Sequence, residues 1–124
     1  MNTLLMLLAG PMQSWGVQSR FEVRDTGLEP SKSGVIGLVC ASLGRPREAP
    51  VDDLASMLFG VRIDVEGRMA RDYHTAMSVL TASGQLKGCQ PSSRYYLSGA
   101  RFLVGLAGPD LDLLLSIHAA LQYP

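Results

Sequence analysis

Several features that mark other classes of protein are scarce in this chain of 124 residues. It has only two cysteines, Cys40 and Cys89, and no Cys-x-x-Cys pair, so a zinc site built from paired thiolates is not expected. The apolar run at residues 4–9 is far shorter than the roughly 20 residues that span a bilayer, and no positive side chain precedes it as in a secretory signal. These absences favour a cytoplasmic protein and suggest no metal or other cofactor.

An excess of charge of either sign is also absent. Eleven basic and eleven acidic residues cancel, so the net charge does not indicate nucleic-acid binding, and a composition of 47% hydrophobic and 18% charged residues is globular. The charged residues are, however, distributed unevenly along the chain. A positive stretch on a neutral protein suits a surface that faces phosphates, although a solvated hairpin with a chance bias remains open. Residues 67–109 hold five basic residues and one acidic residue, namely Arg68, Arg71, Lys87, Arg94 and Arg101 against Asp72.

Apolar spacing predicts a strand and two helices in the first half of the chain. Residues 3–9 form a short apolar run that ends at Gly-Pro, which is typical of a buried strand. Ser33 is a good N-cap for a helix whose apolar spacing continues until Gly44. A second, short helix is predicted over residues 52–58, with Leu54 and Leu58 facing inward.

The second half predicts strands, a loop and a last helix. Residues 61–65 alternate between apolar and charged, as in a half-buried strand, and residues 73–79 alternate less cleanly. Residues 81–93 contain two glycines, a proline and little apolar surface, so they are expected to form a flexible loop. Residues 96–106 predict another strand, and Pro109 opens the final helix.

The order of these elements predicts a single α+β domain over residues 1–124. Strand, helix, strands and helix are the first elements of a β-α-β-β-α-β unit, so we expect a ferredoxin-like (RRM-like) antiparallel sheet with helices on one face. A final strand, which would pair beside the first, is not found. The first strand would then be an exposed apolar edge, and we expect self-association through it unless a partner covers it.

Two glycine-punctuated segments lie where an apolar element meets a loop: AGPMQSWG at residues 9–16 and PSKSGVIG at residues 30–37. A strand end and a helix N-terminus joined by an arginine-bearing loop can form a cradle for an anion. Trp15, the only tryptophan, stands beside it, and an aromatic in a positive cradle is typical of single-stranded nucleic-acid sites. No glycine precedes Lys32 directly, so the full phosphate-loop motif is absent and a nucleotide hydrolase is not expected.

Five segments, taken in order, carry a family resemblance: LAGPMQSWG, RFEVRDT, EPSKSGVIGLV, RDYHTA and RYYLSGARFLVGL. Together they resemble the CasD-type subunit of the type I-E CRISPR surveillance complex (Cascade), part of a repeat-associated RNA-binding superfamily with ferredoxin-like folds. The resemblance implies a subunit without catalytic activity that grips the 5′ handle of the guide RNA (crRNA) in antiviral defence. It also implies that the subunit caps the backbone filament and contacts the backbone and large subunits. Members of the family continue for roughly as many residues again, so the chain resembles an N-terminal fragment.

The residues expected to hold RNA come from the cradle and from the central hairpin, which the resemblance identifies with a thumb-like projection. Basic side chains would neutralise phosphates, and the amides at the start of the first helix would bind one phosphate. Trp15 or Tyr95 would pack on a splayed base, and Gln13 would read a base edge. The full expected set is Gln13, Trp15, Arg20, Arg24, Lys32, Ser33, Gly34, Arg71, His74, Arg94, Tyr95 and Arg101.

Other functions remain open for the same residues. His74, assisted by Tyr73, could act as a general acid or base in metal-independent cleavage of CRISPR repeat RNA, as in a related subunit of another CRISPR subtype. No matching Tyr–Lys–His set is found, since Lys87 falls in the predicted loop. The loops could also serve only to dock protein partners, and Trp15 could simply be a core residue.

Overall fold

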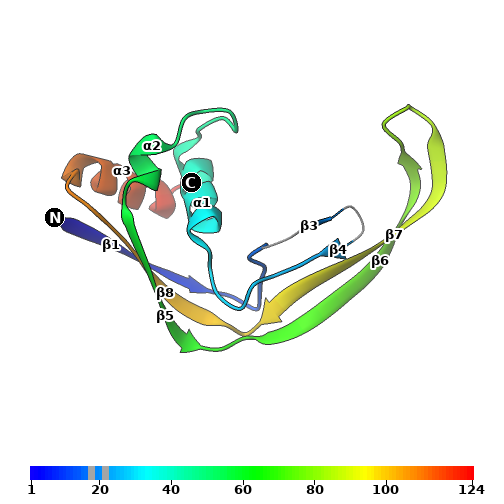
Figure 1. Ribbon diagram of the computed structural model, residues 1–124, viewed down its shortest axis with the longest axis horizontal. Coiled ribbons are helices and arrows are strands. Elements are labelled where there is room, and N and C mark those ends of the chain that lie inside the picture. The colour runs from blue at the N-terminus through cyan, green and yellow to red at the C-terminus, as the bar shows by residue number, and fades with distance from the viewer. Residues whose placement is uncertain (17–18, 21–22) are drawn as a thin grey trace.

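The computed structural model describes residues 1–16, 19–20 and 23–124, and it places three strands from distant parts of the chain in one sheet (Figure 1). They are β1 (Asn2–Ala9), β5 (Leu58–Val65) and β8 (Arg101–Gly108), antiparallel and in the order β1-β8-β5. The α+β prediction is confirmed, and the strand order agrees with a ferredoxin-like arrangement. In the described chain β1 pairs with β8 alone, so it lies at an edge of the sheet.

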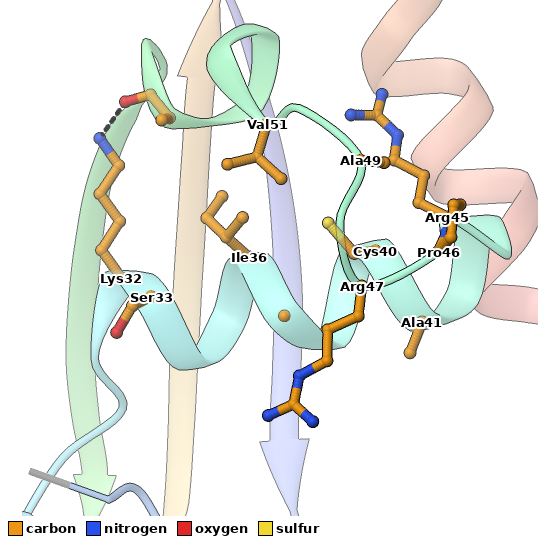
Figure 2. Close-up of a pocket in the computed structure, with 12 residues that line it drawn as sticks. Lys32, Ser33, Ile36, Cys40, Ala41, Arg45, Pro46, Arg47, Ala49 and Val51 are labelled. Atoms are coloured by element: carbon orange, nitrogen blue, oxygen red, sulfur yellow. Dashed lines mark hydrogen bonds between the residues drawn. The ribbon is translucent and has the colours of Figure 1, made fainter.

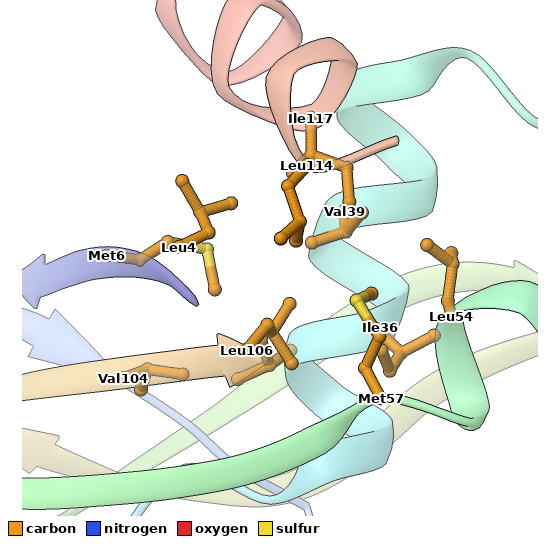
Figure 3. Close-up of a cluster of buried hydrophobic side chains, with 11 residues drawn as sticks. Leu4, Met6, Ile36, Val39, Leu54, Met57, Val104, Leu106, Leu114 and Ile117 are labelled. Atoms are coloured by element: carbon orange, nitrogen blue, oxygen red, sulfur yellow. The ribbon is translucent and has the colours of Figure 1, made fainter. Parts of the chain in front are cut away.

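Helices α1 (Lys32–Leu43) and α3 (Leu111–Gln122) cover one face of this sheet, with the short helix α2 (Asp52–Ala55) beside them (Figure 1). Figure 3 shows the core between the layers, in which Val39, Leu106 and Ile117 are fully buried. Each such side chain stabilises the fold by about 1.5–3 kcal/mol through its removal from water. No helix in the described part of the chain is long and apolar enough to cross a membrane.

A second sheet continues from the first and carries a long hairpin. Its main strands are β6 (Arg68–Leu80) and β7 (Leu86–Ser98), which pair antiparallel along their length. Figure 1 shows this hairpin reaching away from the helices. The long loop expected between the first strand and the first helix contributes three short strands to this sheet: β2 (Met12–Gln13), β3 (Ser19–Arg20) and β4 (Val23–Arg24).

The start of α1 differs from the prediction. Ser31, not Ser33, is the N-cap, because the Gly34 backbone N–H donates to Ser31 Oγ at 3.1 Å. Two serines two residues apart both satisfy the sequence signature, and only the backbone conformation separates them. The end of α1 is confirmed: Gly44 adopts the left-handed conformation, with φ 72°.

The predicted helix at residues 52–58 is wrong in its second half. Helix α2 ends at Ala55, and Leu58 is already in β5, where it pairs opposite Ala107 and is 62% exposed. The prediction for Leu54 is confirmed, since this residue of α2 faces inward and is fully buried. Pairing with β8 therefore prevails over the helical spacing that the sequence suggested.

The predicted loop at residues 81–93 is also wrong, because β7 begins at Leu86 and the turn is confined to residues 81–85. The strand expected over residues 96–106 is divided by Gly99, whose φ of 73° bends the chain between β7 and β8. A hairpin held by main-chain hydrogen bonds can form without apolar residues along both strands. Apolar periodicity therefore did not indicate the first part of β7.

Candidate nucleic-acid interface

Trp15 and Gly34, which the sequence places in one cradle, are in contact. A β-carbon at position 34 would lie 2.8 Å from Trp15 Cε3, so a glycine is needed for the indole to approach the first turn of α1 this closely. The indole is half-buried and packs where two clusters of core side chains meet, beside Leu8 and Val61. Trp15 therefore contributes to packing, and its stacking on a base stays a prediction.

The side-chain amide of Gln13 joins the two sheets. Its Nε2 donates to the carbonyl oxygens of Leu8 at 3.1 Å and Ala100 at 3.0 Å, and its Oε1 accepts from Trp15 Nε1 at 3.1 Å. Both N–H groups of the amide are thus used within the protein. Base reading by Gln13 stays a prediction, and it would have to use the remaining acceptor capacity of Oε1.

Lys32 begins α1 and reaches across to the segment that leads into β5 (Figure 2). Its Nζ donates to the carbonyl oxygens of Ala55 at 2.6 Å and Met57 at 2.7 Å. An ammonium has three donors, so one N–H remains for a phosphate. The Ser33 side of this turn is exposed, and the predicted phosphate contact at the helix N-terminus stays a prediction.

The hairpin brings basic and aromatic side chains together across its strands. Arg71 of β6 lies opposite Tyr95 of β7. The Arg71 guanidinium also lies 5.5 Å from the centroid of the Tyr73 ring, which is a cation–π contact. Arg71 is exposed and Tyr73 is 60% exposed, so this pair offers a positive charge and an aromatic face to a ligand.

A chain of hydrogen bonds holds His74 on the other face of the hairpin. Asp72 Oδ2 lies 3.0 Å from His74 Nδ1, and Ser92 Oγ lies 3.3 Å from His74 Nε2. The carboxylate and the hydroxyl together orient the imidazole ring. Lys87 lies opposite Val79, five residues beyond His74 along β6, so the hairpin does not bring a lysine beside this histidine.

The arginine-bearing segment joins the hairpin through backbone pairing. Arg24 of β4 lies opposite Arg94 of β7, and Arg94 lies opposite Asp72 of β6, so one row crosses three strands. Arg20 is in β3, which pairs with β4. Phe21, from the same sequence segment, lies outside the described residues.

The expected site therefore divides into two groups and one separate residue. One group gathers at the junction of the two sheets, and the other follows the second sheet. The separate residue is Arg101, which is exposed at the start of β8, opposite Ala9 and Val65. The junction group is Gln13, Trp15, Lys32, Ser33 and Gly34, and the sheet group is Arg20, Arg24, Arg71, His74, Arg94 and Tyr95.

Sequence reasoning missed Ser92 of the second sheet, which holds His74, and it considered Tyr73 only as an aid to RNA cleavage, not for binding. In the structure Tyr73 packs beneath Arg71. The alternation over residues 73–79 was a usable signal for Tyr73, whereas Ser92 fell in the segment taken as a loop. No group of three or more His, Cys, Asp or Glu side chains suited to a metal gathers among the described residues.

The fold, with its long hairpin, is shared with known proteins. A family model described as "CRISPR-associated protein (Cas_Cas5)" matches residues 3–124, and the chain belongs to this family. It is similar to the CRISPR system Cascade subunit CasD of Escherichia coli (strain K12), with 38% identity over 117 residues, covering 83% of this chain and 52% of that protein.

Solved structures agree with this assignment. A chain of a "CRISPR RNA-guided surveillance complex" superposes with a TM-score of 0.90 at 39% identity, covering 99% of this chain and 54% of the other. A second structure, "Crystal structure of Cas protein", gives a TM-score of 0.74 at 44% identity, covering 99% and 53%. The chain thus spans about half the length of the relatives it matches.

Proposed function

We propose that this chain acts as an RNA-binding subunit of Cascade, without catalytic activity, that grips the 5′ handle of the crRNA and caps the backbone filament. The similarity to a protein named as a Cascade subunit, and to a chain of an RNA-guided surveillance complex, supports membership of such an assembly. The backbone and large subunits of the complex would be its protein neighbours.

The observation that carries the proposal is the basic and aromatic surface of the second sheet. Arg71 and Tyr73 are exposed on one face of the hairpin, and Arg94 is exposed on the other face, where β4 brings Arg24 into the row beside it. Arginines of this kind pair with phosphates, while each base that stacks on an aromatic ring contributes about 1–3 kcal/mol. Single-stranded RNA with splayed bases is the ligand that fits such a surface.

The test is fluorescence anisotropy with a short 5′-handle RNA and a scrambled RNA at several salt concentrations. We expect tighter binding to the handle and affinity that falls as salt rises. Replacing both Arg71 and Arg94 with alanine should lower affinity on the order of ten-fold and reduce the salt slope by about 1.4, because two phosphate contacts are lost.

Arg62→Ala is the matched control, since it also removes an exposed arginine but lies on β5, where Arg62 pairs with Asp64 at 2.6 Å. It should leave the slope unchanged. Equal slopes for the double variant and the control would show that the hairpin does not face phosphates. Equal affinity for handle and scrambled RNA would show that handle recognition lies outside this chain.

Metal-independent RNA cleavage is the second candidate, and the oriented imidazole of His74 is the observation in its favour. Repeat RNA incubated with the chain and a chelator tests it. Cleavage that disappears in His74→Ala would establish this activity and overturn the binding-only proposal.

A further inference from the structure

A groove of about 590 Å³ runs between α1 and the segment at residues 45–55 (Figure 2). None of its lining residues belongs to the second sheet. Its walls are largely apolar, formed by Ile36 and Cys40 of α1 on one side and by Pro46, Ala49 and Val51 on the other. The groove is therefore separate from the surface proposed to bind RNA.

Hydrogen bonds from basic side chains hold both ends of the groove in place. At one end, Lys32 Nζ is bound to the carbonyl oxygens of Ala55 and Met57. At the other, Arg45 binds Asp53 with both terminal nitrogens, at 2.9 and 2.6 Å, and this hydrogen-bonded pair lowers the pKa of the Asp53 carboxyl. The shape of the groove is thus formed before anything occupies it, which reduces the entropic cost of binding.

The charged residues that line the groove are all basic. Two of them, Lys32 and Arg45, are engaged as described above. Arg47 is exposed, and Figure 2 shows its side chain crossing in front of α1, with the guanidinium on the side of the helix opposite Val51. No hydrogen bond or ion pair joins it to another residue in the described part of the chain. An occupant with a carboxylate at this position would therefore complement the groove.

The exposed side of α1 allows another backbone to come close. A β-carbon at Gly37 would meet no atom within 4 Å, and Ala41 is exposed one turn further along. Small residues four apart on a helix let a second helix pack at short distance. The apolar walls would receive side chains of that helix, as in other helix-in-groove interfaces.

We propose that this groove docks an acidic amphipathic helix from another protein subunit of the complex, with apolar side chains against Ile36 and Val51 and a carboxylate on Arg47. The inference rests on the proposed function, because the occupant comes from the same assembly. RNA fits the groove poorly, since apolar walls give little to phosphates or ribose.

The test compares Gly37→Trp with Gly37→Ala in the co-expressed complex. The indole would fill open space in the groove, so the fold should tolerate it, whereas alanine leaves the groove free and favours the helix. We expect Gly37→Trp, and to a lesser degree Arg47→Glu, to reduce recovery of the partner subunit at least ten-fold, with Gly37→Ala unchanged. Thermal unfolding of each variant excludes misfolding as the cause.

Handle-RNA anisotropy on the same variants separates this inference from the proposed function. Unchanged RNA binding with lost partner recovery supports the groove, whereas unchanged recovery in Gly37→Trp overturns it and leaves the RNA proposal standing. A chain that neither joins the complex nor binds RNA would overturn both.

A photoreactive benzoylphenylalanine at position 37 then identifies the occupant. A cross-link to an acidic helix of another subunit is the expected result. A cross-link to RNA, to a second copy or within the same polypeptide would overturn the proposal, as would no cross-link.

Discussion

The helix-covered face of the first sheet and the hairpin of the second sheet use their apolar residues in opposite ways. In the first sheet, alternate residues of β8 are buried, with Val104 and Leu106 fully covered beneath the helices. In the hairpin of the second sheet, Met69, Tyr73 and Met77 share one face of β6 and are 50%, 60% and 71% exposed. The covered face of the first sheet supplies stability, whereas the hairpin leaves adaptable and aromatic side chains exposed.

The junction between the sheets is packed almost as tightly as the core. Leu97 at the end of β7 and Ala100 in the following bend are both fully buried, beside Phe102. The Gln13 amide crosses the same region with two donated hydrogen bonds. The base of the hairpin is therefore fixed to the body, and we expect its mobility to increase toward the turn.

The largest effect should come from a cavity in the first sheet. Leu106→Ala removes a fully buried side chain from the core and should lower the free energy of unfolding by about 2–5 kcal/mol. Met77→Ala on the hairpin is the matched variant and should change stability by less than about 0.5 kcal/mol, because its side chain is exposed. Urea denaturation followed by circular dichroism measures both. A similar loss of unfolding free energy in both variants would mean that Met77 is buried against another part of the protein and not exposed.

A smaller effect should come from the junction. A β-carbon at Gly67 would lie 2.9 Å from the β-carbons of both Leu97 and Ala100, so Gly67→Ala forces the base of the hairpin to shift. We expect a loss of about 1–3 kcal/mol, as for other overpacked sites, together with faster amide exchange near the base of β6 and β7.

Gly88→Ala provides the control for this junction variant. Position 88 lies in the same hairpin, and a β-carbon there would meet nothing within 4 Å. Its stability should stay close to that of the natural chain. If Gly67→Ala is as stable as Gly88→Ala, the junction has room for a β-carbon at position 67 and is less tightly packed than its contacts indicate.

The sequence predicted those parts of the fold in which local signals and tertiary packing agree. The apolar run of β1 and the left-handed Gly44 at the end of α1 are of this kind. It failed for the first part of β7, since polar residues such as Ser92 and Ser93 in that strand resemble a loop. For the site, two short motifs placed Trp15 beside the start of α1, but the partners of Lys32 lie more than 20 residues further along the chain and could not be found by spacing.

The smallest predicted effect concerns Lys32, at the start of α1 in the junction group of the expected site. Its ammonium is bound to the Ala55 and Met57 carbonyls, so Lys32→Met should lower the free energy of unfolding by about 1–2 kcal/mol through loss of charged hydrogen bonds. If the ammonium is wholly occupied there, the salt slope of RNA binding should stay the same. If its third N–H also holds a phosphate, the slope should fall by about 0.7 while stability drops equally. Anisotropy and denaturation on one preparation distinguish these outcomes, because a structural lysine changes only the second measurement and a phosphate-binding lysine changes both.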